Sequence, residues 1–246
     1  MHLKEKGKRV IYRKAALPQK LICGLPQNDY ICSMIITVTS LKGGVGKSTI
    51  TQNLAVSFKL KGYSVVIVDV DTNQSCLDWL TERESEENYI HVVGLPDGKA
   101  LVKSLKGLND NYDIILIDGT PAIDQKTSRI MRVADLIIVP LRAGKMDLSA
   151  TTIFLDKHQE AVELKGSDIP LYALLNEFNE DLIISRHVKQ AIENTDINLL
   201  KNSIRHRTAY PVANIYGLGA VEHSDKKAKK EIENVTDEIL SILLKL

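Results

Sequence analysis

Residues 34–52 read MIITVTSLKGGVGKSTITQ, and this stretch decides the fold of the chain. The apolar start predicts a buried strand over 34–40. A glycine-rich loop follows at 41–46, and a helix is expected to open at Lys47. Strand, glycine loop and helix start together form a site for a nucleotide's phosphate chain, because backbone N–H groups and the positive end of the helix dipole point at one anion.

Each residue type in the loop suits that site. The glycines let successive N–H groups turn toward the phosphates, Lys47 can reach the β and γ phosphates, and the Ser48 hydroxyl can ligate Mg²⁺. The alternative, a glycine-rich turn that binds nothing, fits poorly with Gly-Lys-Ser placed between a strand and a helix. The predicted nucleotide-binding residues of the loop are Gly43, Gly44, Val45, Gly46, Lys47, Ser48 and Thr49.

The loop departs from the general P-loop pattern at one position. That pattern has Gly five residues before the Gly-Lys pair, where this chain has Leu41, and a second lysine, Lys42, follows it. The form KGGVGKST resembles the deviant Walker A box of the ParA/MinD ATPases. In that family the extra lysine crosses a dimer interface to the partner's nucleotide. The resemblance therefore implies ATP and Mg²⁺ as ligands, an ATP-dependent homodimer, and Lys42 acting in trans.

Length and composition are typical of one globular domain. The chain has 246 residues, 44% hydrophobic and 26% charged, enough for one domain with a substantial core. Cys23, Cys32 and Cys76 show no metal-binding spacing and are odd in number, so we expect a reducing, cytoplasmic compartment. No run of about 18 apolar residues argues for a membrane-spanning helix, and the charged start lacks the apolar segment typical of a secretory signal.

Residues 1–33 are expected to form a basic N-terminal arm outside the domain. They hold seven basic and two acidic side chains and include Pro18 and Pro26. Met34 begins the first strand directly, so an extension upstream of the biological start is one interpretation. A disordered tail and a tail that contacts DNA are the others. Residues 181–230, with nine basic and five acidic side chains, are also compatible with a polyanionic partner.

From residue 34 onward, apolar runs alternate with segments of helical spacing. Expected strands cover 34–40, 64–70, 90–94, 113–118, 135–141, 169–176 and a short run near 197–204. Expected helices cover 47–61, 75–84, 98–107, 124–133, 147–164, 182–194 and 224–245. This alternation predicts an α/β fold with a mostly parallel twisted sheet and helices on both faces. We expect a single P-loop ATPase domain over 34–246, with ligands at the carboxyl ends of the strands.

Asp118 ends the apolar run IILID and is the predicted second anchor of the Mg²⁺ site. A carboxylate facing Ser48 across the loop suits the hydration shell of Mg²⁺. This is a Walker B interpretation, in which residues 119–121 (Gly-Thr-Pro) form a switch that senses the γ-phosphate. The alternative is a strand-end aspartate that caps the next turn.

Asp69 and Asp71 lie two residues apart at the end of the second predicted strand. Because side chains alternate along a strand, both can point toward the phosphates and hold Mg²⁺ waters or the attacking water. The sequence VDVDTNQSCLDW resembles the family's Walker A′ box, with Thr-Asn at 72–73 where the family usually has Pro-Gln and with Trp79 kept. By this resemblance Asp71 orients the attacking water. The predicted catalytic residues are Lys42, Lys47 and Asp71, and the predicted metal ligands are Ser48, Asp118 and Asp69.

Three later segments extend the resemblance. Residues 134–150 resemble the family's sixth-strand region, although residues 142–145 (Arg-Ala-Gly-Lys) replace its proline-rich stretch. Asn176 matches a family position that hydrogen-bonds adenine, or is a turn residue at a strand end. The segment IRHRTAY at 204–210 looks like the partition branch of the family. Without an N-terminal helix-turn-helix domain, the sequence is most similar to small, type Ib, ParA partition proteins.

The leading hypothesis is therefore an ATP-driven DNA segregation protein. ATP closes a sandwich dimer, the dimer binds nonspecific DNA, and a centromere-binding adaptor of the ParB/ParG type triggers hydrolysis and release. Hydrolysis alone is expected to be slow, because no arginine finger, worth about 10³–10⁵ in rate, is evident. Nucleoid association is expected in the ATP-bound state. Predicted DNA contacts are Arg205, Arg207, Lys226, Lys227, Lys229 and Lys230, which suit sequence-independent phosphate neutralisation. For 226–230, a solvated helix face is an equal alternative.

Two other classes remain open. A MinD-like membrane-associated ATPase, or another cargo-positioning ATPase, is the first. Its membrane form needs a basic amphipathic C-terminal helix, whereas 236–246 (TDEILSILLKL) looks like a helix that packs on a core. A metabolic or redox relative is the second. No cysteine follows Asp118 to bridge a cluster, and the small-substrate pocket of a synthase cannot be read from sequence.

Overall fold

The computed structural model describes residues 33–40, 42–84, 88–96, 100–121, 125–142, 148–195 and 197–246. Residues 148–150 are described by their backbone alone. The predicted arm, apart from Ser33, lies outside the described residues, as do Leu41 and the 143–147 part of the sixth-strand region.

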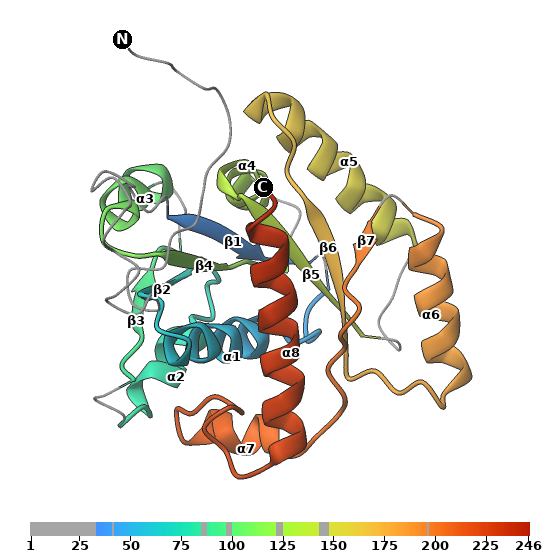
Figure 1. Ribbon diagram of the computed structural model, residues 1–246. Helices are drawn as coiled ribbons and strands as arrows, with labels where there is room; N and C mark the ends of the chain where they lie inside the picture. The colour runs from blue at the N-terminus through green and yellow to red at the C-terminus, as the bar shows by residue number, and fades with distance from the viewer. Residues whose placement is uncertain are drawn as a thin grey trace, which may run out of the picture.

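Strands and helices alternate along the described chain (Figure 1), which confirms the predicted α/β class. The strands are β1 (Met34–Val38), β2 (Val65–Asp69), β3 (His91–Gly94), β4 (Ile114–Asp118), β5 (Leu136–Arg142), β6 (Leu171–Asn176) and β7 (Asn198–Leu199). The helices are α1 (Lys47–Leu60), α2 (Ser75–Thr81), α3 (Leu101–Asn109), α4 (Gln125–Val133), α5 (Leu148–Lys165), α6 (Ile183–Glu193), α7 (Ala209–Ile215) and α8 (Lys226–Leu243).

The sheet has the strand order β3-β2-β4-β1-β5-β6-β7, and every adjacent pair is parallel. All carboxyl ends therefore meet at one edge. In register, Asp118 at the end of β4 lies beside Val38 of β1 and Asp69 of β2. The glycine loop leaves β1 at the same edge, between its neighbours β4 and β5. Topology thus brings the predicted phosphate and metal residues together.

The sheet is buried on both faces, which explains its continuous apolar strands. Alternate residues of β1 enter different cores: Ile36 and Val38 join the core under α1 and α8, while Ile35 joins the core under α3 and α4. A further core, under α4, α5 and α6, covers the β5 and β6 side. The predicted helix face of α1 is confirmed, since Ile50, Leu54, Ala55 and Phe58 are all buried.

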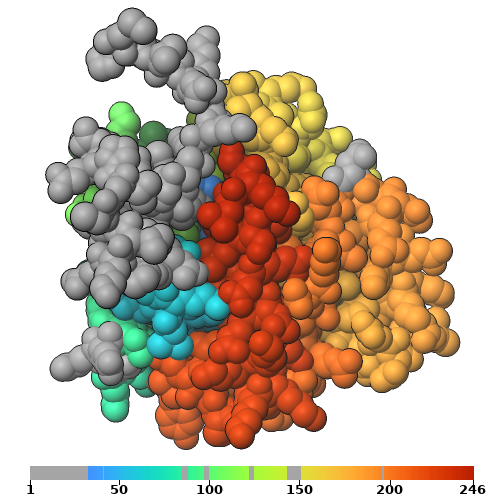
Figure 2. Space-filling view, viewed as in Figure 1, coloured from blue at the N-terminus to red at the C-terminus, as the bar shows by residue number. Residues whose placement is uncertain are grey.

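Helix α8 runs along the face that also carries α1 (Figure 1), and in Figure 2 it forms a continuous red band beside the cyan of α1. Its start is capped by Asp225, whose Oδ1 accepts hydrogen bonds from the N–H groups of Lys227 and Ala228. Its apolar residues, including Ile232 and Ile239, belong to the core. This confirms the prediction of a core-packing C-terminal helix. In the described part of the chain, no helix is long and apolar enough to cross a bilayer.

Helix α2 ends at Thr81, three residues before the predicted end, and two further elements differ from the sequence predictions. Helix α7 was not predicted, because its seven residues are too short for an apolar period. Pro211 is its third residue, where the first turn tolerates proline. Strand β7 covers two residues rather than the run near 197–204, although the Ile204 N–H still bonds the Leu175 carbonyl oxygen.

The segment after α7 is fastened to α2 by a buried ion pair. The Arg83 guanidinium, fully buried, lies 2.8 Å from the Glu222 carboxylate and donates to the carbonyl oxygen of Gly217. The Trp79 indole N–H donates to the Leu218 carbonyl oxygen, and the Arg83 guanidinium lies over the same indole ring. The end of α2 and the segment that leads into α8 are therefore one packed unit.

Candidate active site

The glycine loop packs tightly against the end of β6. Gly46 has φ +94°, in the left-handed region, and a Cβ there would lie 2.4 Å from Nδ2 of Asn176. The Asn176 side chain is held by donating from Nδ2 to the carbonyl oxygen of Val45 at 2.8 Å. Glycine is required at this position on both counts, since the conformation is strained for other residues and the space is filled.

Lys47 begins α1 and is only 6% exposed. Burial lowers the pKa of its ammonium group, while the nearby carboxylates of Asp118 and Asp71 act in the opposite direction. A lysine held this deep is rare unless it meets negative charge. With the N–H groups of the loop around it, Lys47 forms an electropositive centre suited to phosphate oxygens.

A cavity of about 360 Å³ lies over the loop. Its walls come from the loop, the start of α1, the segment after β2, the segment after β4, and α7. The predicted γ-phosphate switch contributes Pro121 to this wall. The lining residues are Gly43, Gly44, Gly46, Lys47, Ser48, Thr49, Gln52, Asp71, Asn73, Ser75, Pro121 and Asn214.

Asp118 lies behind this cavity and is fully buried. Its carboxylate accepts hydrogen bonds from the hydroxyl of Thr51 at 3.4 Å and from the thiol of Cys76 at 3.3 Å, and the Ser48 side chain also bonds it. Burial raises the pKa of Asp118 to about 7, opposed mainly by the Ser48 hydrogen bond. Asp118 therefore reaches the cavity through Ser48, and the pair supplies the oxygen donors that Mg²⁺ prefers.

Asp69, the last residue of β2, and Asp71 lie in different environments, contrary to the expectation that both point toward the phosphates. Asp71 lines the cavity, and its Oδ1 accepts a hydrogen bond from the Asn73 N–H. The Asp69 carboxylate is fully buried and accepts hydrogen bonds from the N–H groups of Asp71 and Cys76. Burial raises the pKa of Asp69. Asp69 thus braces the loop that presents Asp71, and its carboxylate lies close to that of Asp118.

A second cavity of about 360 Å³ adjoins the first and shares Gly46, Thr49 and Asn214 with it. Asn176 lines it, and because Nδ2 is used on Val45, the Oδ1 atom of this amide is left as an acceptor. Adenine presents an amino donor that such an acceptor can bind. A phosphate chain over the loop and a base beside Asn176 would therefore lie in adjoining cavities.

Comparison with known proteins decides the family. A family model described as the CobQ/CobB/MinD/ParA nucleotide binding domain matches residues 36–220. The chain belongs to this family. The match spans the loop, the aspartates at and after the ends of β2 and β4, and Asn176. It includes every residue that lines the phosphate cavity and all but Ile232 of those that line the second cavity.

Relatives and solved structures add detail. This family member is 26% identical over 208 residues to the maintenance of carboxysome distribution protein A of Halothiobacillus neapolitanus, covering 83% of this chain and 95% of that protein. It is 24% identical over 223 residues to Protein ParA of Rhizobium radiobacter, covering 86% and 97%. A putative plasmid partition protein from Borrelia burgdorferi B31, solved with AMPPNP, has TM-score 0.70 at 21% identity, covering 85% and 99%, which shows the shared fold.

Sequence analysis did not identify three residues of this ParA/MinD-family site, which are Gln52, Cys76 and Asn214. Gln52 donates from Nε2 to the Ser75 carbonyl oxygen and accepts at Oε1 from Nδ2 of Asn214. Cys76 contacts both buried aspartates. Burial, and then the Asp118 carboxylate, raises the pKa of its thiol well above the usual range. Their partners lie 7 to 162 residues away along the chain, so no local pattern marks them.

The predicted DNA contacts do not form one uniform set. All four lysines at the start of α8 are exposed, as is Arg205. Arg207 is instead bound by its Nε and Nη2 atoms to the carboxylate of Glu231, at 3.1 and 2.6 Å, and the Tyr210 hydroxyl donates to the same carboxylate. Arg207 therefore has a structural partner within the chain, whereas the exposed lysines at 226, 227, 229 and 230 face solvent.

Proposed function

We propose that this chain is an ATP-dependent DNA-partition ATPase that works as a homodimer. The observation that carries the proposal is the buried Lys47 at the base of a cavity whose wall includes Ser48 and Asp71. Family membership supports nucleotide binding, and the AMPPNP-bound partition protein from Borrelia burgdorferi has the same fold. Hydrolysis and the DNA role go beyond those findings and are proposed here, for a single domain over 34–246.

The loop from Gly43 to Thr49 is the proposed cradle for the phosphates, with Asn176 at the adenine. Ser48 and Asp118 are the proposed Mg²⁺ set, with Asp69 behind them as the second carboxylate. Bound Mg²⁺ would neutralise charge on the β and γ phosphate oxygens. Asp71 is the residue proposed to orient an attacking water, and its position in the wall of the phosphate cavity, at 9% exposure, supports that role.

Lys42 is the proposed link between two copies of the chain. It is half-buried, and it is not among the described residues that line the phosphate cavity of its own chain. Because Lys42 belongs to the glycine loop but is not part of that wall, we propose that it meets a phosphate of a second copy. ATP would then favour the dimer, because each nucleotide would be contacted by both chains.

The exposed lysines at the start of α8, with Arg205, are the proposed DNA surface. Such a surface neutralises phosphates without reading bases, so binding should depend steeply on salt. Arg207 contributes through its ion pair with Glu231 by holding the 204–210 segment against α8. A centromere-binding adaptor of the ParB/ParG type would stimulate hydrolysis, and the ATP-bound dimer would associate with the nucleoid.

The decisive experiment measures DNA affinity by fluorescence anisotropy, with ATP, with ADP and without nucleotide, across a salt titration. We expect ATP-dependent binding that weakens steeply with salt. The double variant Lys227→Glu with Lys230→Glu should lose this binding and keep ATP affinity. The matched control is Lys103→Glu with Lys106→Glu, two exposed lysines on α3. Equal losses in both double variants, or salt-independent binding, would contradict the DNA role.

Positioning of a protein assembly is a second candidate, favoured by the carboxysome distribution protein among the relatives. It shares the ATP step and differs in cargo, so adaptor pull-down with the ATP-bound chain separates it from DNA partition. A membrane-associated positioning ATPase is less well supported, because the apolar face of α8 is used by the core. ATP-dependent flotation with anionic liposomes would restore that candidate.

A further inference from the structure

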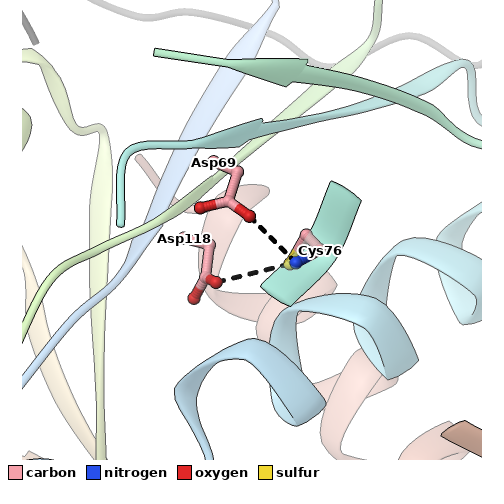
Figure 3. Close-up of side chains that lie close together, drawn as sticks. All are labelled: Asp69, Cys76 and Asp118. Atoms are coloured by element: carbon pink, nitrogen blue, oxygen red, sulfur yellow. Dashed lines mark hydrogen bonds between the residues drawn. The ribbon is translucent and has the colours of Figure 1, made fainter. Parts of the chain in front are cut away.

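Cys76 is the second residue of α2, and it touches two carboxylates that come from neighbouring strands. Its thiol lies 3.3 Å from Oδ2 of Asp118, and its backbone N–H donates to Oδ2 of Asp69 at 2.9 Å. Figure 3 shows the three side chains converging from β2, β4 and α2. All three are 0% exposed, so water does not compete for these contacts.

We propose that Cys76 is a positioning residue for the Mg²⁺ site, its thiol fixing the orientation of the Asp118 carboxylate toward Ser48. The inference rests on the proposed Mg²⁺–ATP function and names a residue whose side chain that function has not used.

The hydrogen bonds around Asp118 define what the thiol does. Thr51 donates to Oδ1 and the thiol to Oδ2, so each carboxylate oxygen has its own donor. The Ser48 side chain also bonds this carboxylate. A serine hydroxyl that donates its proton to Asp118 keeps its lone pairs for a metal ion. Rotation of the carboxylate would turn the Ser48 oxygen away from the cavity, and the thiol donor opposes that rotation.

Cys76 also ties the metal side of the site to the water side. Its N–H holds Asp69, and Oδ1 of Asp69 holds the N–H of Asp71, the residue proposed to orient water. One residue of α2 therefore sets the Asp118 carboxylate and the Asp71 loop relative to each other. Outer partners of metal ligands typically change metal affinity by about 10–100-fold when they are replaced.

Three substitutions separate a donor role from simple packing, because Cys76 also belongs to the hydrophobic core. Cys76→Ser keeps a donor on a slightly shorter side chain. Cys76→Val keeps apolar volume and has no donor. Cys76→Ala loses both. If Cys76 only packs, the Cys76→Val variant should behave like the parent and the Cys76→Ser variant like Cys76→Ala. If the thiol positions Asp118, Cys76→Ser should behave like the parent and Cys76→Val like Cys76→Ala.

The measurement is the Mg²⁺ concentration that half-saturates binding of a fluorescent ATP analogue, with a parallel affinity measurement in EDTA. For Val and Ala we expect a rise of about tenfold. For Ser the rise should stay within about threefold, and metal-free affinity should change by less than about twofold in all three. Circular dichroism melting confirms that the variants compared are folded.

Two results would overturn the inference, and they are distinguishable. If Val matches the parent while Ser matches Ala, the thiol only fills space, and the proposed function stands. If the parent itself binds the analogue equally with Mg²⁺ and with EDTA, the Mg²⁺ site of the proposed function fails, and this inference fails with it.

Discussion

The lysines of the phosphate site and of α8 lie in opposite environments, one buried and the others exposed to solvent. Lys47 is 6% exposed and lies among carboxylates at the base of a cavity, whereas the four lysines at the start of α8 face solvent. Removing a buried charge leaves defined neighbours uncompensated, while exposed charges are screened by water and salt. Removing one interior charge should therefore change stability or ligand affinity strongly. Removing one surface charge should have a small effect, and the effects of several should add.

The buried ion pair between Arg83, just past the end of α2, and Glu222, in the segment after α7, should give the largest effect. Glu222→Gln leaves the fully buried Arg83 guanidinium without its counter-charge, so we expect the free energy of unfolding to fall by about 3 kcal/mol. Urea denaturation measures it. The matched control is Asp237→Asn, which breaks the ion pair between half-buried Lys61 and exposed Asp237 and should cost less than about 1 kcal/mol. Equal losses of unfolding free energy in Glu222→Gln and Asp237→Asn would contradict the expected difference between buried and surface charges.

Lys47→Ala should weaken ATP binding by about 100-fold, because charge-assisted hydrogen bonds to the phosphates are lost at a desolvated site. Isothermal titration with ATP and Mg²⁺ measures the affinity. Lys103→Ala, at an exposed position on α3, serves as the control and should change it by less than about twofold. A loss of only a few fold at Lys47 would mean that the phosphates lie elsewhere.

Two glycines of the same loop provide the third comparison. Gly46→Ala places a Cβ 2.4 Å from Asn176 at φ +94°, and should lower the free energy of unfolding by about 1–3 kcal/mol without nucleotide. Gly43→Ala meets nothing within 4 Å and should change stability by less than about 0.5 kcal/mol. Thermal melting of both variants tests this. A stable Gly46→Ala would show that the loop can relax away from β6.

The stability of the metal-free protein should depend on pH through Asp118. Its pKa is raised to about 7 in the folded state, so between about pH 4 and 7 the folded protein binds a proton that the unfolded chain has released. Stability from this group therefore falls as pH rises through that window, by up to about 1.4 kcal/mol per pH unit. Asp118→Asn should remove this component of the slope.

Urea midpoints in EDTA at about pH 5 and pH 7.5 measure the difference in slope between parent and variant. Asp168→Asn, at an exposed position, is the control and should keep the parent's slope. An Asp118→Asn variant with the same slope as the parent would place the buried proton on another group.

A single surface lysine should give the smallest effect. Lys229→Ala should reduce DNA affinity by about two- to fivefold and the slope of log affinity against log salt by about 0.9. Replacing all four lysines should reduce that slope by about 3.6. Anisotropy titrations at several salt concentrations measure both. An all-or-none loss at Lys229 would contradict additive surface binding.

Local pattern predicted the parts of the site that lie on one stretch of chain. The glycine loop, Lys47, Ser48 and the strand-end aspartates follow from residue types next to strands and helices. Asn176 lies 131 residues from the Val45 carbonyl oxygen that it binds, and its position was expected only from family resemblance. Cys76 gave no signal, because a lone cysteine without metal spacing has no local pattern.

Pairings across long separations explain the other differences. Side-chain alternation placed Asp69 toward the phosphates, but two N–H groups from the following turn and α2 hold its carboxylate instead. Helix α7 is positioned by tertiary contacts such as that of Asn214 with Gln52, 162 residues away. Arg207 was predicted as a DNA contact from its charge, and its partner Glu231 lies 24 residues further along. The local spacing of residue types in the sequence does not indicate any of these long-range contacts.

The ends of the sheet have a consequence for how copies of the chain can meet. The outermost strands, β3 and β7, cover four and two residues, so each rim has little unpaired backbone for a foreign strand to join. Such short edge strands disfavour edge-to-edge pairing of sheets from different copies of the chain. For the proposed homodimer, this favours an interface formed by side chains of loops or helices over one formed by pairing of sheet edges.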